Sequence, residues 1–141
     1  MVPGTLKAVL WELDQLARPG ANGCGCCAII NADIVAAARV FVRALLKAVP
    51  HRPQVVPTAS GKLQLVWYCG LETLELEFES TQTIYFWKSC GDLGIADEAT
   101  FPAADVEYAV ALVEGFRNGT CRTALPETEA ALTRRWAVQP G

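Results

Sequence analysis

The sequence contains 141 residues, of which 52% are hydrophobic and 19% are charged. Twelve lysines and arginines stand against fifteen aspartates and glutamates, which gives a net charge of −3 and a pI of about 5.1. This length fits a single domain, and the apolar content excludes an intrinsically disordered chain. The acidic balance disfavours binding to the phosphate backbone of a nucleic acid.

The most apolar stretch, residues 26–49, is long enough to span a membrane. It carries Asp33, Arg39, Arg43 and Lys47 spread along its length, and charges within a membrane-spanning helix are costly. We therefore expect a buried amphipathic helix and no membrane partner. Residues 1–10 lack the apolar run and the small-residue cleavage site of a secretory signal. We expect a cytoplasmic protein, in which thiols stay reduced.

Two helices are predicted in the first part of the chain. In residues 6–17, apolar side chains recur at helical spacing, and Pro19 follows them. A second helix is expected to begin near Asn31, a typical N-cap, with Asp33 in the first turn, where the helix dipole favours a negative charge. It should end before Pro50, because a residue that precedes proline disfavours the helical conformation.

After Pro50 the apolar pattern changes to the period of two that is typical of strands. The pattern is clearest in residues 73–79, where leucine and phenylalanine alternate strictly with glutamate. Short turns separate four such segments, so we expect an antiparallel meander with one face on the helices. Residues 89–100 are expected to form a loop. The four predicted strands are residues 54–58, 62–69, 73–79 and 83–88.

A third helix is predicted over residues 102–117, because proline is favoured in a first helical turn and Asn118-Gly119 is a typical C-terminal stop. The fold class is therefore α+β, with two N-terminal helices and a C-terminal helix packed on one face of a four-stranded antiparallel meander. Residues 1–119 are expected to form this single domain. Residues 120–141 are expected to be a C-terminal extension, with a short helix over residues 126–136 that folds back on the domain.

The middle of the chain carries the run Pro53-Gln54-Val55-Val56-Pro57-Thr58, followed by Gly61-Lys62-Leu63-Gln64-Leu65-Val66-Trp67 and then by Leu74-Glu75-Leu76-Glu77-Phe78. These motifs resemble those of a set of small uncharacterised bacterial α+β proteins. The resemblance implies a fold and carries no function. Ala21-Asn22-Gly23-Cys24-Gly25-Cys26-Cys27 stands where those proteins have a tryptophan–aspartate–glycine loop, so a role of that loop does not transfer to this chain.

Six cysteines are many for so short a chain, and three of them are clustered. Closely spaced thiols such as Cys24, Cys26 and Cys27 can bind a soft metal or undergo redox exchange. A structural zinc site usually has four ligands in two C-x2-C pairs, and this chain has no second pair. We expect no cofactor, with zinc or another soft metal as the alternative. Two other interpretations of the cysteines are a functional thiol or disulfide and reduced cysteines with a structural role. The scattered residues that folding would have to gather into a site are Cys69, Cys90, Cys121 and His51.

Glu75, Glu77 and Glu79 share one side of a predicted strand at a spacing of about 7 Å, since each residue rises about 3.3 Å. Paired carboxylates can perform acid–base chemistry or hold a divalent cation. No histidine, tyrosine pair or glycine-rich loop is placed to support catalysis, so we assign no catalytic residue. We favour a solvated strand face. His51, which follows the end of the second helix, is expected to be exposed.

The fourth predicted strand is apolar on both sides, with Ile84 and Phe86 on one and Tyr85 and Trp87 on the other. One of these pairs must therefore point away from the helices. Exposed aromatic side chains beside carboxylates are typical of a protein-binding patch.

Val66 and Tyr68 are expected to point outward beside the glutamates and to extend this patch. Alternatively, the C-terminal segment covers this patch, with Trp136 or Leu132 packed against the aromatic side chains. Both arrangements fit the sequence.

These observations predict a non-enzymatic protein-interaction module, an adaptor or a regulatory or accessory subunit that binds a partner protein. A thiol- or metal-dependent protein that uses Cys24, Cys26 and Cys27 is the alternative, and homo-oligomerisation is compatible with either. The residues expected to contact the partner are Tyr68, Glu75, Glu77, Tyr85 and Trp87.

Overall fold

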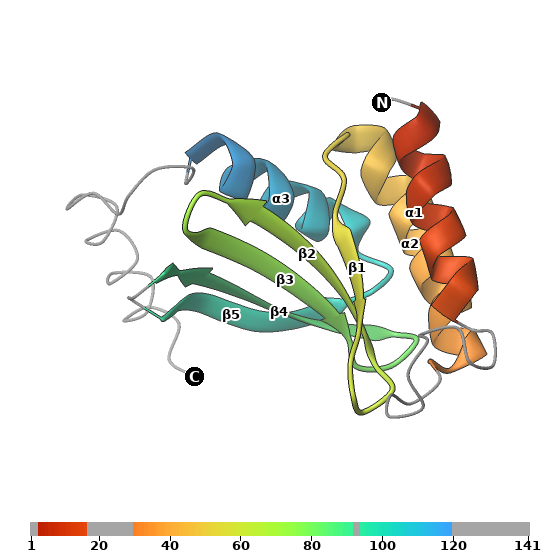
Figure 1. Cartoon of the computed structure of the whole chain (residues 1–141). Helices are drawn as coiled ribbons and strands as arrows, with labels where there is room; N and C mark the ends of the chain where they lie inside the picture. Colours follow the sequence, from red (N-terminus) through yellow and green to blue (C-terminus); the bar gives the residue numbers. More distant parts are fainter. Residues whose placement is uncertain (1–2, 17–29, 92–93, 120–141) are drawn as a thin grey trace.

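The computed structural model describes residues 3–16, 30–91 and 94–119. In these ranges the chain forms three helices and five strands, which confirms the α+β class (Figure 1). The helices are α1 (Pro3–Leu16), α2 (Ala32–Ala48) and α3 (Val106–Gly119). The strands are β1 (Gln54–Pro57), β2 (Leu63–Cys69), β3 (Glu72–Phe78), β4 (Thr83–Cys90) and β5 (Ile95–Pro102). The C-terminal helix predicted over residues 126–136 lies outside the described residues.

The five strands form one antiparallel sheet in which every strand pairs with its neighbour in the chain, in the order β1-β2-β3-β4-β5. The prediction of four strands is wrong, because the second half of the expected loop belongs to β5. This strand pairs with β4 along residues 83–89, with an irregularity in the register between Lys88 and Ser89. The sequence did not predict this strand because Asp97 and Glu98 interrupt the alternation of apolar and polar residues. Charged residues of this kind are common on edge strands, where they discourage aggregation.

One face of the sheet, called here the core face, packs against the helices. Every second side chain of the central strands is buried on this face, and together with apolar residues of all three helices they form a single cluster. Phe78 of β3 meets Phe41 of α2 edge to face, with ring centroids 5.4 Å apart. Figure 1 shows α3 behind the sheet and the α1–α2 pair beside β1. The opposite side of the sheet is therefore the surface on which to look for function.

The ends of α2 follow the predicted signals. The Asn31 side-chain oxygen accepts a hydrogen bond from the backbone N–H of Asp33 at 2.7 Å, which makes Asn31 the N-cap. At the other end, the backbone N–H of Val49 donates to the carbonyl of Leu45 at 2.9 Å before Pro50 continues the chain. Among the described residues, no helix has the length and apolarity needed to cross a bilayer.

The start of α3 corrects the prediction. The helix begins at Val106, because Pro102 is the last residue of β5 and not part of a first helical turn. Asp105 precedes the helix, and its side chain accepts a hydrogen bond from the backbone N–H of Tyr108 at 3.2 Å. This is the contact of an N-cap residue. The aspartate was therefore a better start signal than the proline.

Two glycines shape the end of the sheet at which β2, β3 and β4 meet. Gly70 and Gly91 have φ values of 64° and 50°, in the left-handed region that favours glycine. The backbone N–H of Gly91 donates to the carbonyl of Leu71 at 2.9 Å. This bond joins the β2–β3 turn to the end of β4.

Candidate interaction surface

The side of the sheet opposite the core face, called here the outer face, carries all five residues predicted to bind a partner. The strand register places Glu75 opposite Trp87 and Glu77 opposite Tyr85. Tyr68 lies opposite Thr73, at one end of the array. The structure therefore gathers four of the five residues and leaves Tyr68 at the margin.

Most of these side chains are less exposed than the sequence pattern suggests. Tyr68 is 56% exposed, whereas Glu75, Glu77, Tyr85 and Trp87 are half-buried. Val66 lies opposite Glu75 and so shares the outer face, but only 3% of it is exposed. The outer face is thus a packed layer of side chains and not a row of protruding ones.

Tyr85 and Trp87 stack on each other at the centre of this layer. Their ring centroids are 5.3 Å apart, and their planes are inclined by 28°. The Tyr85 hydroxyl donates a hydrogen bond to Glu98 of β5, and Trp87 lies opposite Glu75 of β3 in the strand register. Each ring therefore lies beside a carboxylate on a different neighbouring strand, and the Tyr85 ring is held by its hydrogen bond.

Carboxylates dominate the electrostatics around this aromatic pair. The hydrogen bond to Glu98, then burial, then the charges of Glu98, Glu79 and Glu77 raise the pKa of Tyr85 to about 12. The tyrosine hydroxyl consequently stays a hydrogen-bond donor well above neutral pH. The raised pKa also shows that the charges of Glu77, Glu79 and Glu98 act on the same tyrosine of the outer face.

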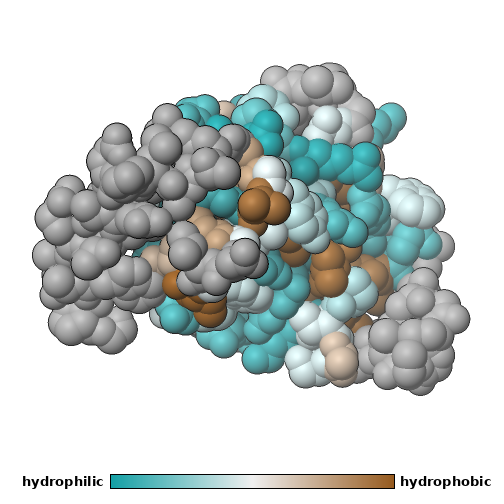
Figure 2. Space-filling model, turned by 60° about the vertical axis from the view of Figure 1, so that its left-hand side comes forward, coloured by the Kyte–Doolittle hydropathy of each residue, from teal (hydrophilic) through white to brown (hydrophobic). Residues whose placement is uncertain are grey.

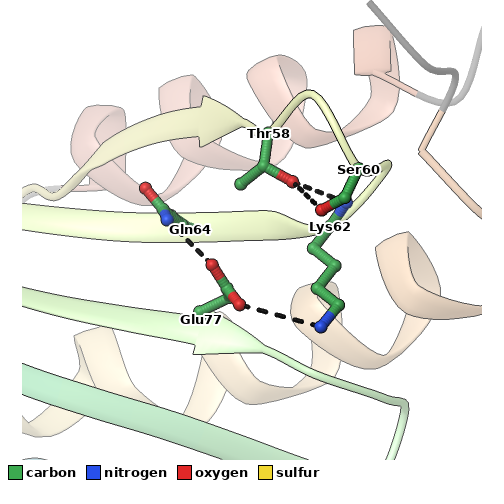
Figure 3. Close-up of polar contacts among 5 residues, drawn as sticks. All are labelled: Thr58, Ser60, Lys62, Gln64 and Glu77. Carbon is green, nitrogen blue, oxygen red and sulfur yellow. Dashed lines mark hydrogen bonds and ion pairs between the residues drawn. The ribbon is translucent and has the colours of Figure 1, made fainter.

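Glu77 is held from the side of β2 (Figure 3). Its Oε1 accepts a hydrogen bond from the Gln64 amide at 2.8 Å, and its Oε2 lies 4.0 Å from the Lys62 Nζ. The turn before β2 positions Lys62, because the Thr58 hydroxyl accepts a hydrogen bond from the Lys62 backbone N–H at 2.9 Å. The Thr58 hydroxyl also contacts that of Ser60, at 3.0 Å. Lys62 is thus the basic side chain that the structure pairs with the glutamates of β3.

The surroundings of Glu75 shift its pKa. Burial raises its pKa above the ordinary value, while hydrogen bonds from Trp87 and Thr73 oppose this shift. The charge of Glu77 adds a smaller increase. Burial prevails, so folding leaves Glu75 harder to ionise than an exposed glutamate.

Replacing Glu75 by glutamine is therefore expected to stabilise the protein at neutral pH. A carboxyl with a pKa raised by folding destabilises the native state when it is charged, and this penalty disappears as the pH falls through the raised pKa. Glutamine keeps an oxygen that can accept the Trp87 N–H. Thermal unfolding from pH 7 to about pH 4 should show a higher Tm for Glu75→Gln at pH 7 and a difference that shrinks towards acid. A difference that is independent of pH would contradict this expectation.

A shallow groove adjoins Tyr68 at the β1 edge of the outer face. The Arg52 Nη2 lies 2.6 Å from the Glu12 Oε1, so the two charges of the groove are paired with each other. Pro53 and Val66 add buried apolar surface. The groove extends the outer face towards α1. Its lining residues are Glu12, Arg52, Pro53, Gln54, Val66 and Tyr68.

The cysteines of the sheet do not pair with each other. Cys69 and Cys90 end β2 and β4, and Glu72 of β3 lies between them in the register. Neighbouring strands are about 4.8 Å apart, so the two Cα atoms are about 10 Å apart, beyond the reach of a disulfide. Cys69 is nevertheless disulfide-bonded, whereas Cys90 is a free thiol. The expectation of reduced cysteines is wrong for Cys69.

Cys90 is held as a neutral thiol. Its Sγ donates a hydrogen bond to the Glu72 Oε1 at 2.9 Å. Burial, followed by the hydrogen bond and the charge of Glu72, raises the pKa of Cys90 to about 11. Glu72 is 6% exposed, and its Oε2 has no hydrogen-bond partner among the described residues. This arrangement suppresses the reactivity of the thiol.

The metal hypothesis finds no support in the part of the chain that the structure describes. In residues 3–16, 30–91 and 94–119, no group of three or more His, Cys, Asp or Glu side chains could hold a metal ion. The predicted cluster of Cys24, Cys26 and Cys27 lies outside these ranges, as does Cys121. A zinc site at the cluster therefore stays a prediction.

His51 corrects a smaller expectation. It is half-buried and not exposed, and its backbone carbonyl accepts a hydrogen bond from the Trp67 indole N–H at 2.9 Å. Burial, and then the positive charge of Arg117, lower the pKa of His51. The histidine is thus half-buried, with its backbone bound by Trp67 of β2 and its ring close enough to Arg117 of α3 to feel its charge, and it is not an exposed group at a helix end.

Sequence reasoning missed Glu98, the partner of Tyr85, because the residue lies in the stretch predicted as a loop. A weak signal was present, since Glu98 and Thr100 alternate with Ala99 and Phe101. It also missed Glu72, whose burial on the core face breaks the rule that glutamates of β3 point outward. Comparison of the chain with models of protein families, with curated proteins and with solved structures found no match.

Proposed function

We propose that this protein is a non-enzymatic interaction module, an adaptor or accessory subunit that binds a partner protein through the outer face of its sheet. The stacked Tyr85–Trp87 pair carries this proposal. Tyrosine and tryptophan are enriched among the residues that dominate binding energy at interfaces. The Tyr85 ring is already held by its hydrogen bond to Glu98, and the Trp87 ring stacks on it. Side chains that are ordered before binding lose little conformational entropy on association.

The surroundings of the pair support the same function. Glu75, Glu77 and Glu98 flank the rings, and Gln64 extends the polar border. An aromatic centre with a polar rim is the usual anatomy of a protein–protein interface. In the view of Figure 2, apolar side chains of the described residues form separate patches within a mostly hydrophilic surface. A surface of this kind suits a partner recognised by specific contacts more than one held by a broad apolar face.

Affinity capture from an extract of the cells that make the protein, followed by mass spectrometry, would test the proposal. Trp87→Ala is expected to lose the captured partner. Removing a residue that dominates binding costs about 2 kcal/mol or more, which is about 30-fold or more in affinity. Trp11→Ala is the matched control, since Trp11 lies on α1 and is 64% exposed. The partner is then purified, and its affinity for each variant is measured by titration.

Circular dichroism should first confirm that each variant is folded. A partner that binds the wild type, Trp87→Ala and Glu77→Lys with equal affinity would contradict a role for the outer face. If only the Trp11→Ala variant loses the partner, the binding surface lies on α1 and not on the outer face.

A further inference from the structure

We propose that the partner is basic and that the outer face binds an arginine side chain of that partner against the Tyr85–Trp87 pair. This inference rests on the proposed function and names the chemistry of its partner. It follows from the charge of the outer face, from the geometry of the two rings and from the hydrogen-bonding capacity of the carboxylates beside them.

The charge around the two rings is negative. Glu75 and Glu77 on β3 and Glu98 on β5 lie on either side of β4, which carries the rings. Lys62 is the cation paired with this set, at 4.0 Å from Glu77. Among the residues that the structure describes, these three carboxylates against one paired ammonium group leave an excess of negative charge. Complementary potentials attract a basic partner and repel one that carries phosphates.

The rings provide a place for a cation. The hydrogen bond to Glu98 uses the Tyr85 hydroxyl, and stacking uses one face of each ring. Both side chains are half-buried, so a part of the aromatic pair remains exposed for a further contact. A cation within about 6 Å of an aromatic centroid is attracted to the ring face, and tryptophan is the strongest acceptor.

Arginine fits this arrangement better than lysine. Its planar guanidinium can stack on an aromatic ring and at the same time donate two parallel hydrogen bonds to a carboxylate, whereas an ammonium group acts as a point charge. Glu98 is the best-placed acceptor. It is exposed and accepts the Tyr85 hydroxyl on Oε1, and a carboxylate can accept about four hydrogen bonds in all.

The test titrates the full chain calorimetrically with synthetic peptides of one length, in which serine alternates with arginine, with lysine or with glutamate. The arginine peptide is expected to bind about tenfold more tightly than the lysine peptide, and its affinity should fall with added salt. The glutamate peptide should not bind. Glu98→Gln keeps an oxygen for Tyr85 and removes the charge, so it should weaken arginine binding about tenfold. Trp87→Ala should do the same, and Trp11→Ala should change nothing.

Equal affinity for the arginine and lysine peptides would overturn the inference, as would no binding at millimolar peptide. Arginine binding that Glu98→Gln leaves unchanged would also overturn it, and this variant keeps the test valid if Trp87→Ala fails to fold. None of these results affects the proposed function, which depends on whether Trp87→Ala loses the captured partner.

Two further measurements identify a different occupant. If Arg134→Ala combined with Arg135→Ala raises the affinity for the arginine peptide tenfold or more, the occupant is this chain's own C-terminal segment. If sedimentation shows a dimer that Glu98→Gln disrupts, the occupant is a second copy. Either result would overturn the assignment to a basic partner protein.

Discussion

Replacing Phe78 by alanine is expected to lower the free energy of unfolding by about 3–5 kcal/mol. Phe78 is 0% exposed, and its ring meets that of Phe41 edge to face, so it joins β3 to α2. Alanine would remove these contacts and leave a cavity that the surrounding core can only partly fill. Because single domains are stable by about 5–15 kcal/mol, the variant would lose a large share of its stability. Urea denaturation followed by circular dichroism measures the change.

Tyr68→Ala is the matched control for this experiment. Tyr68 is also an aromatic residue of the sheet, but it lies on the outer face and is 56% exposed. Its replacement should change stability by about 0.5 kcal/mol or less. A similar loss for the two variants would show that the core face does not hold the helices in the way described.

Cys90 is expected to react with iodoacetamide at about pH 8 roughly a hundred times more slowly than an ordinary cysteine. The thiolate is the reactive form, and folding raises the pKa of this thiol from 9.0 to about 11. The population of thiolate below pH 9 therefore falls about a hundredfold. Since the chain has six cysteines, the rate is to be read by mass spectrometry from the peptide that contains Cys90.

Two comparisons complete the measurement on Cys90. Unfolding in denaturant should restore the ordinary rate, and Glu72→Gln should speed the native reaction because it removes the charge beside the thiol. Burial, and then the hydrogen bond to Glu72, favour the neutral thiol in the folded protein, so this contribution to stability is complete below pH 9 and is lost as the pH rises through about 11. A native rate equal to the rate in denaturant would refute the buried contact.

The elements predicted most closely are those with local signals. The cap at Asn31 and the proline after Val49 fix both ends of α2 without help from the rest of the chain. The strict alternation of β3 likewise shows which side chains are buried. By contrast, β5 depends on its pairing with β4. Half of its residues have no apolar signal, so the short alternation of Glu98 to Phe101 is too weak by itself to identify Ile95–Pro102 as a strand.

The same distinction applies to the outer face. A period of two places Glu75, Glu77, Tyr85 and Trp87 on one side of the sheet, and this much the sequence predicts. The contacts among them need the register of three strands, which the sequence does not contain. For that reason the hydrogen bond from Tyr85 to Glu98 could not be predicted from the sequence. The hydrogen bond from Cys90 to Glu72 could not be predicted either, since it depends on the burial of both side chains at the end of the sheet.

The order of the strands bears on how the protein is made. Each strand of the sheet pairs with the one before it in the chain, so the sheet can grow one hairpin at a time, and folds with such local pairing form quickly. During synthesis β5 leaves the ribosome after the other four strands. Glu98 is on β5, and the Tyr85 ring is therefore anchored only when the last hairpin closes. A nascent chain that stops short of β5 would carry the stacked rings without the carboxylate that orients them.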